Sequence, residues 1–270
     1  MRQGRRLTAA LLLMAALLSG CGTDTDDTTP EPTSPETTTV AVYFMTETRA
    51  GPRLVREMRD ALATDPVSAA VKLMFEGATD PDYFNPWNPA AVVLGVEVSG
   101  DSIEVDVSPE VRTANVGSGG AALMVQQLVY TATDAAGIDG NVVLLVEGEP
   151  AGELWGVLSW DEPVAREPAE NVRQLVQIDS PVEGAEVSSP VTIQGEAAVF
   201  EANLPWRVLD EGGAVVESGF TMTEEGQRFA PFSFAVELEP GAYTVEIVED
   251  DPSGGEGGPP MTDTRTITVG

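Results

Sequence analysis

The sequence predicts an α+β domain of order β-α-β-β-α-β, with two helices on one sheet, followed by an all-β sandwich. Two observations support this prediction. Between residues 40 and 150, two stretches with helical periodicity alternate with runs of β-forming residues. From residue 172 onward, short alternating apolar and polar runs follow one another, separated by turn residues. The expected domains therefore span residues 40–150 and 172–270, and residues 151–171, with Pro163 and Pro168 among charges, are expected to link them.

The β-forming runs of the first domain are rich in β-branched and aromatic residues and are bounded by turn residues. They lie at residues 40–46, 52–59, 92–99, 102–107 and 141–148. The third and fourth runs flank Gly100-Asp101, a pair that favours a hairpin turn. In the fourth run Ile103, Val105 and Val107 alternate with acidic residues, so one face of this hairpin is expected to be buried.

Two helices are expected between these strands, each with its own start and stop signals. Asp65 is a suitable N-cap and Pro66 suits the first helical position. One apolar stripe then follows at helical spacing, and Gly77 lies near its end. The stripe consists of Val67, Ala70, Val71, Met74, Phe75 and Ala78. The second helix is expected to be capped by Ser118 and closed by Gly137, with Ala121, Met124, Val125, Leu128 and Ala132 among its apolar residues.

The second domain contains seven short β-like runs, a number typical of an immunoglobulin-like sandwich. They lie at residues 175–178, 191–197, 206–210, 215–221, 232–238, 243–248 and 265–269. The cysteine pair that joins the two sheets in many such domains is absent from the sequence, because the chain has one cysteine. Trp206 and the phenylalanines are therefore expected to fill the core.

The start of the chain has the layout of a lipoprotein signal. Arg2, Arg5 and Arg6 precede an apolar run of twelve residues, about 18 Å as a helix, which is too short to span a membrane. "LSGC" then resembles the bacterial lipobox, so residues 1–20 are expected to be a signal peptide and Cys21 the site of lipid attachment. Residues 21–39 are acidic and rich in threonine and proline, which predicts a disordered tether.

Composition excludes several classes of function. The formal net charge is −30, with one lysine, so binding to nucleic acid is not expected. The chain has no histidine, and its one cysteine is expected to carry lipid. A Ser-His-Asp enzyme, a cysteine enzyme and a zinc hydrolase are therefore excluded, whereas paired carboxylates stay open as a catalytic device. We expect no catalytic residues, no cofactor and no metal. The acidic composition is explained either by solubility and habitat or by cation binding.

Both predicted domains resemble known families. "VAVYF", "AVKLMFEGAT", "SIEVDVSPEV", "ALMVQQLVYTATD" and "VVLLVEGE" resemble the GerMN domain, named from a spore-germination lipoprotein. "IDSPVEGAEVSSPVTIQGEAAVFEANLPWRVLDEGGAVV" resembles the immunoglobulin-like domain of bacterial spore germination, and the match extends through "FSFAVEL" and "GAYTVEIVEDDPSGG". The first resemblance implies a ring-building or docking module in an envelope assembly.

A few residues outside these patterns are candidates for chemistry. The acidic groups Asp24, Asp26 and Asp27, and Asp250, Asp251 and Glu256, lack the spacing of a calcium loop. Glu201 is expected to pair with Arg207 and not to catalyse. Tyr83, Phe84 and Trp87 form either a stacking surface for a sugar or protein or, as the favoured interpretation, a lid on the core of the domain.

The function expected from these observations is that of a non-catalytic protein, lipid-anchored through Cys21 on the outer face of a bacterial cell membrane. It would act as an interaction or scaffold module in the envelope, with a link to sporulation or germination. Its partners would be other envelope proteins or the cell-wall polymer. The alternatives are a carboxylate-dependent enzyme that acts on the cell wall and a sensor of a small ligand or cation.

Overall fold

The computed structural model describes residues 36–250, 256 and 258–270. All of the described residues belong to one compact unit, Pro35–Gly270. The predicted signal peptide, Cys21 and most of the tether lie outside the described residues. So do the acidic candidates Asp24, Asp26, Asp27 and Asp251.

The described chain begins with a long antiparallel hairpin. Strands β1 (Thr37–Thr48) and β2 (Gly51–Leu62) pair over their full length, from Thr37 with Leu62 to Thr48 with Gly51. Gly51 has a φ of 89°, a left-handed conformation that suits glycine in this tight turn. Residues 40–46 are all buried, so the centre of β1 is covered on both faces. Both strands are longer than the sequence predicted, because hydrogen-bonded pairing continues into threonine-rich and charged residues at the hairpin's open end.

Helices α1 (Pro66–Glu76) and α2 (Ser118–Ala136) confirm the predicted helical segments. Asp65 caps α1, and its side chain accepts a hydrogen bond from the Ser68 N–H at 3.3 Å. Gly77 follows α1 and Gly137 follows α2, both with positive φ. Ser118 is the first residue of α2 and not its cap, because Gly117 occupies the N-cap position. Among the described residues, no helix is long and apolar enough to cross a membrane.

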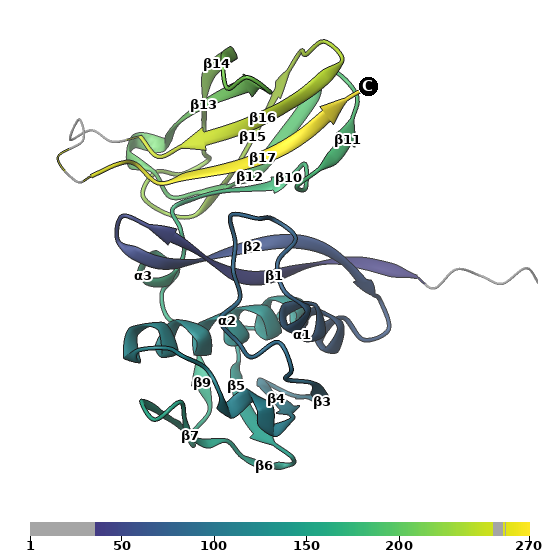
Figure 1. Ribbon diagram of the computed structural model, residues 1–270, viewed down its shortest axis with the longest axis vertical. Coiled ribbons are helices and arrows are strands. Elements are labelled where there is room, and N and C mark those ends of the chain that lie inside the picture. Colours follow the sequence, from purple (N-terminus) through teal and green to yellow (C-terminus); the bar gives the residue numbers. More distant parts are fainter. Residues whose placement is uncertain (1–35, 251–255, 257) are drawn as a thin grey trace, which may run out of the picture. The chain divides into compact units, whose positions relative to one another are not determined.

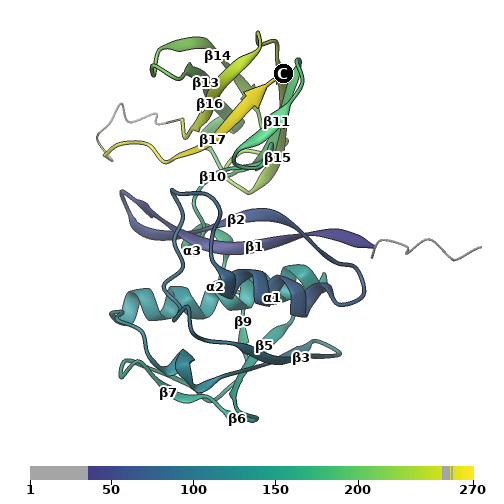
Figure 2. The ribbon, with the colours of Figure 1, turned by 45° about the vertical axis from the view of Figure 1, so that its right-hand side comes forward.

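A second sheet lies on the other side of the helices from the hairpin (Figures 1 and 2). Its strands run in the order β3-β4-β5-β6, with β9 also paired to β5, and β4 and β5 are parallel. Their bounds are Val93–Ser99, Ser102–Val107, Asn141–Val146, Glu149–Pro150 and Val164–Ala165. The α+β class is therefore confirmed. The prediction of a single sheet is wrong in this detail, because β1 pairs with β2 in a separate two-stranded sheet and the helices lie between the two sheets.

The stretch expected as a linker, residues 151–171, contains ordered elements. Strands β7 (Gly152–Leu154) and β8 (Leu158–Trp160) form a small hairpin, and helix α3 spans Ala169–Val172. Leu154 and Trp160 are buried in the core of the first domain. A short 3-10 turn, η1 (Pro109–Arg112), lies earlier, between β4 and α2. The domain boundaries themselves stay predictions.

The second half of the described chain is the expected sandwich of two sheets. One sheet has the strand order β10-β12-β15 and the other β11-β17-β16-β13-β14. The first sheet consists of Val176–Ser180, Val191–Ala197 and Ala230–Val236. The second consists, in spatial order, of Ala185–Val187, Thr262–Val269, Gly241–Val248, Asn203–Asp210 and Val215–Met222. All seven predicted strands are present, and β11, which is only three residues long, is the addition.

The core of the sandwich is filled as expected without a disulfide. Trp206 stacks on Phe234 with ring centroids 4.7 Å apart, and Phe232 is buried beside them. Gly195 lies opposite Phe232 in the register of β12 and β15, and the Phe232 ring occupies the space where a β-carbon of residue 195 would be. Aromatic side chains therefore replace the missing cysteine pair as the filling between the sheets.

Candidate binding pocket

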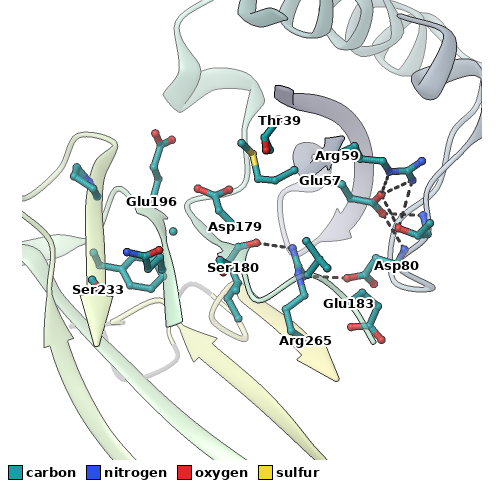
Figure 3. Close-up of a pocket in the computed structure, with 18 of the residues that line it drawn as sticks. Thr39, Glu57, Arg59, Asp80, Asp179, Ser180, Glu183, Glu196, Ser233 and Arg265 are labelled. Carbon is teal, nitrogen blue, oxygen red and sulfur yellow. Dashed lines mark hydrogen bonds and ion pairs between the residues drawn. The ribbon is translucent and has the colours of Figure 1, made fainter. Parts of the chain in front are cut away.

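A pocket of about 1000 Å³ opens between the hairpin β1–β2 and the sandwich (Figure 3), and we call it the large pocket. One wall comes from the first domain, at Thr39, residues 57–60, Thr79 and Asp80. The other wall comes from the sandwich, at residues 178–180, 182–183, 194–196 and 231–233, together with Met222, Glu224 and Arg265. Both walls lie in the single unit Pro35–Gly270.

The lining of the large pocket is acidic with an apolar component. Its carboxylates are Glu57, Asp60, Asp80, Asp179, Glu183, Glu196 and Glu224. Its cations are Arg59 and Arg265, and its larger apolar side chains are Met58, Ile178, Val182, Met222 and Phe232. A surface of this kind repels anions and favours ligands that carry positive charge.

Arg265 on β17 lies at the centre of a buried ion cluster beside the pocket. Its guanidinium donates to Asp80 Oδ2 at 2.9 Å, to Asp263 Oδ1 at 3.0 Å and to the Ile178 carbonyl at 2.7 Å. It also donates to the Tyr83 hydroxyl at 2.8 Å, and that hydroxyl donates to Asp263 Oδ1 at 2.7 Å. Asp80 and Tyr83 come from the first domain, so the cluster ties the two domains together.

Burial sets the protonation of this cluster. It raises the pKa of Asp80 to about 6, although Arg265 and a hydrogen bond from the Asp82 N–H act in the opposite direction. Burial also raises the pKa of Asp263 and raises that of Tyr83 well above its ordinary value. For Arg265, burial alone would lower the pKa, but Asp263, Tyr83 and Asp80 outweigh it and the pKa is raised. The guanidinium is therefore the fixed charge around which the acids are arranged.

Glu57 on β2 holds the loop that follows α1 in place. Its Oε1 accepts hydrogen bonds from the Thr79 N–H at 2.9 Å and the Asp80 N–H at 2.8 Å. Its Oε2 accepts from the Thr79 hydroxyl at 2.8 Å and from Arg59 Nε at 2.7 Å. This carboxylate therefore positions Asp80 toward Arg265, and both of its oxygens are occupied.

A second arginine, Arg56, joins the hairpin to the sandwich on the other side of the pocket. Its Nε and one terminal nitrogen bind the two oxygens of Asp179 at 2.9 and 2.6 Å. The same nitrogen lies 3.2 Å from Glu196, which also pairs with Arg173 at 3.0 Å. Burial acts to raise the pKa of Glu196, but Arg56 and Arg173 outweigh it and the pKa is lowered. Glu196 is therefore ionised, and its charge is balanced by two guanidinium groups.

The aromatic loop expected to cover the core has two roles. Trp87 is buried and packs edge-on against Phe75 and Trp155, with centroids 5.4 Å apart in each pair, as the favoured interpretation predicted. Tyr83 is buried too, but its hydroxyl belongs to the Arg265 cluster. Phe84 is partly exposed, and its backbone pairs with Met45 on β1. The loop therefore covers the core of the first domain and supplies a contact to the second.

The other predicted candidates lie apart from the pocket. Glu201 does not pair with Arg207: Arg207 pairs with Glu246 across β13 and β16, and the backbone of Glu201 is left-handed (φ 53°). Asp250 accepts a hydrogen bond from the Asn203 side chain at 2.9 Å. Within the described residues, no group of three or more carboxylates, thiols or imidazoles is placed to hold a metal ion.

Sequence reasoning missed Arg265, Asp80 and Arg56, which define the site. One signal was present in "TDTRTITV", where Asp263, Arg265, Ile267 and Val269 alternate with threonines and share the buried face of β17. The alternation places a charged pair on the same face as two core residues, which marks a buried ion cluster. The partners of Arg265 in the first domain could not be found this way, because they lie more than 180 residues away in the sequence.

Family models match both halves of the chain. The model described as "Sporulation and spore germination" matches residues 41–152. The model described as "Immunoglobulin-like domain of bacterial spore germination" matches residues 175–256. The chain therefore combines a GerMN domain with an immunoglobulin-like domain of bacterial spore germination, which confirms the resemblance found in the sequence. Neither description names an enzymatic activity.

Solved structures with low similarity accompany these matches. The tandem GerMN domains of the sporulation protein GerM from Bacillus subtilis share 16% identity, with a TM-score of 0.42 over 48% of this chain and 46% of that one. The first GerMN domain of the same protein also shares 16% identity, with a TM-score of 0.34. That match covers 46% of this chain and 97% of the other. CopC from Methylosinus trichosporium OB3b shares 24% identity, with a TM-score of 0.27 over 36% and 91% of the two chains. A comparison with curated proteins gave no match. The assignment of the two domains to their families rests on the two family models.

Proposed function

We propose that this protein is a non-catalytic, lipid-anchored component of the bacterial envelope that takes part in sporulation or germination by binding other envelope components. The observation that carries the proposal is the pairing of two domains matched by germination families, joined by the buried Arg265 cluster and the partly buried Arg56 cluster. Such a pair presents its surfaces in a fixed relation, which suits recognition of a partner. Cys21, in a lipobox-like context at the end of a signal-like segment, supports attachment to the outer face of the membrane.

The state of the pocket carboxylates supports binding over catalysis. A glycosidase of the carboxylate type needs one acid that can donate a proton and a second carboxylate facing it across the substrate. Asp80 has the raised pKa of a general acid, but its side chain is 2% exposed and one oxygen is bound to Arg265. Glu57, Asp179 and Glu196 are each held by arginine or backbone donors. Asp80, Asp179 and Glu196 hold the two domains together, and Glu57 positions Asp80.

The anchor is tested by labelling cells with radioactive palmitate. The wild-type chain should incorporate label and fractionate with membranes, and Cys21→Ala should remove both properties. Ser19→Ala, a change beside the expected cleavage site that leaves the thiol in place, serves as the control and should still be labelled. Label that survives Cys21→Ala, or a wild-type chain that takes up none, would remove the lipid from the proposal.

The binding role is tested by cross-linking in sporulating or germinating cells of the host, followed by purification of the anchored chain. Specific envelope proteins or wall fragments should co-purify with the wild-type chain. They should be depleted with Arg265→Met, which loosens the fixed relation of the domains. Release of soluble fragments from purified peptidoglycan by the isolated chain would instead support the enzymatic alternative.

A further inference from the structure

Strand β14 (Val215–Met222) is an open edge of the sandwich with exposed apolar side chains. It pairs with β13 on one side, and no backbone hydrogen bond of the described chain covers its other edge from Val215 to Phe220. Beyond that stretch the Thr221 hydroxyl donates to the Ser233 carbonyl of β15 at 3.5 Å, and the Glu224 N–H donates to the Pro231 carbonyl at 3.2 Å. Phe220 is 71% exposed and Met222 57%, and the two lie on one face of the strand. Val216 is exposed as well, at the point where the pairing with β13 shifts by one residue. Edge strands are usually protected by proline, charged residues, a β-bulge or a covering segment, and β14 has the register shift at Val216 and one charged residue, Glu217. Residues 215–222 contain neither proline nor lysine.

Acidic hollows flank both ends of this strand. The large pocket begins at Met222 and Glu224, at its C-terminal end. A hollow of about 360 Å³, which we call the small pocket, lies at Val216 and Glu217, at its N-terminal end. The small pocket is otherwise lined by Glu237, Leu238, Glu239 and Tyr243, so it contains three glutamates and no basic residue. The two hollows are separated by the six residue steps from Val216 to Met222, about 20 Å of extended chain.

We propose that the edge of β14, between the two pockets, binds an extended basic segment of a partner protein by strand addition. The backbone of the segment pairs with the free edge of β14. Its apolar side chains rest on Val216, Phe220 and Met222. Its lysine or arginine side chains reach the glutamates of the small pocket and the acidic rim of the large pocket. This inference names the kind of partner for the binding role proposed above and rests on that role.

Charge selects this occupant over others. The surface around β14 carries Glu217 in the strand, Glu237 and Glu239 beside one end and Glu224 at the other, whereas Arg207 on β13 is neutralised by its pair with Glu246. A second copy of this chain, with a net charge of −30, would be repelled. The acidic stretch at residues 22–39 of the same chain is repelled for the same reason. An extended segment with apolar and basic residues can pair with the edge of β14 and can place its positive charges at the carboxylates of the two pockets.

The probe for this proposal is an eight-residue peptide of alternating valine and arginine, blocked at both ends, titrated calorimetrically into the full chain. The chain is purified from whichever cell fraction contains it. The peptide should bind, and the affinity should fall as sodium chloride rises from 50 to 500 mM. A peptide with glutamate in place of arginine should not bind. The arginine peptide with alternate amides N-methylated should bind at least about tenfold more weakly, because strand pairing needs those donors.

Matched variants locate the binding surface. Phe220→Ser and the double change Glu217→Gln with Glu224→Gln should each weaken the arginine peptide about tenfold. Leu94→Ser and the double change Glu97→Gln with Glu104→Gln alter an exposed apolar residue and two acids on the β3–β4 hairpin, whose β3 is also an edge strand. These control changes should leave the affinity unaltered. The far-ultraviolet circular dichroism and melting temperature of each variant should match those of the wild-type chain.

Several results would overturn the proposal. They are no binding of the arginine peptide, equal binding of the N-methylated peptide, weakening by the β3–β4 changes but not by the β14 changes, and binding of spermine as tight as that of the peptide. The last result would assign the acidic surface to small polyamines. The outcome is independent of the palmitate experiment, because peptide binding can succeed or fail whether or not Cys21 carries lipid.

Discussion

The Arg265 guanidinium lies 2.9 Å from Asp80 Oδ2, and the two side chains are 3% and 2% exposed although Arg265 lies in the sandwich and Asp80 in the first domain. Removing two charges from water is costly, and the cost is offset only when each charge is paired and hydrogen-bonded. Here Asp263, Tyr83 and the Ile178 carbonyl complete the set of partners. The relation of the two domains is therefore specified by a polar contact that has few acceptable alternatives.

Replacing Arg265 with methionine should destabilise the protein strongly. The change leaves Asp80 and Asp263 buried without their counter-ion, a loss of about 3–5 kcal/mol in the free energy of unfolding. Urea unfolding followed by tryptophan fluorescence measures it. Arg207→Met is the matched control, because Arg207 is also on the sandwich and also pairs with a carboxylate, but its side chain is 48% exposed. The control should cost less, about 1–2 kcal/mol, because water reaches Arg207 although its partner Glu246 is only 12% exposed. Equal losses for the two variants would contradict the importance of burial.

Asp80 should make stability depend on pH in an unusual direction. Its pKa is about 6 in the folded protein and 3.8 in the reference state, so between these values the folded chain holds a proton that the unfolded chain has released. Folding is then favoured by protons, and the contribution of Asp80 to stability falls as pH rises from about 4 to 6. The fall amounts to at most about 3 kcal/mol, from two pKa units.

The measurement compares wild type with Asp80→Asn, which does not titrate, by urea unfolding between pH 4 and 8. The difference in free energy of unfolding, wild type minus variant, should decrease from pH 4 to about 6 and then stay level. Tyr83 does not change its charge in this range, because burial raises its pKa far above it. Asp263 and Arg265 are present in both proteins. Parallel curves for the two proteins would show that the Asp80 pKa is not raised.

Tyr83→Phe tests the hydroxyl that bridges the cluster. The change removes a donor to Asp263 and an acceptor for Arg265, and it keeps the aromatic packing. A loss of about 1–3 kcal/mol in the free energy of unfolding is expected, because both charged partners stay buried. Tyr243→Phe is the control, since its hydroxyl donates to the Glu239 carbonyl in an exposed position. It should change stability by less than about 0.5 kcal/mol. A loss for Tyr243→Phe as large as that for Tyr83→Phe would count against the bridge.

Much of the fold could be predicted because its signals are local. Asp65, Pro66 and the apolar stripe up to Phe75 lie within one helix, and a cap and a period of 3.6 residues suffice to identify it. The alternation in β15 likewise placed Phe232 toward the core. The pairing of β1 with β2 in a sheet of its own was not predicted, because composition shows that a strand forms but not which strand it pairs with.

The large pocket was beyond sequence reasoning for a related reason. Its walls come from β2 and the loop after α1 on one side and from β10, β12, β15 and β17 on the other. Asp80 and Arg265 are 185 residues apart. In a chain with 44 acidic residues, nothing in the pattern distinguishes Asp80 from its neighbours, whereas Arg265 stands out because it alternates with core residues. The basic partner was therefore the detectable half of the contact.

Gly195→Ala should show how tightly the sandwich wall of the large pocket is packed. A β-carbon at this position would lie 1.9 Å from the Gln177 carbonyl oxygen and 2.9 Å from the Phe232 ring. The carbonyl belongs to the backbone of β10, so β10 must move away from β12, at a cost of about 1–3 kcal/mol or more. Gln177 also donates to the Arg56 carbonyl at 2.7 Å, so the shift should loosen the hairpin contact as well.

Gly119→Ala is the matched control for this change. Gly119 is the second residue of α2 and a β-carbon there would meet open space, so alanine should be neutral or stabilise the helix by up to about 0.5 kcal/mol. Urea unfolding gives both values, and amide hydrogen exchange shows where the structure loosens. Exchange should quicken in β10 and in the β2 segment around Arg56 in Gly195→Ala, and in neither segment in Gly119→Ala. Faster exchange confined to β12 would show that the hairpin is not coupled to the packing of the sandwich through Gln177.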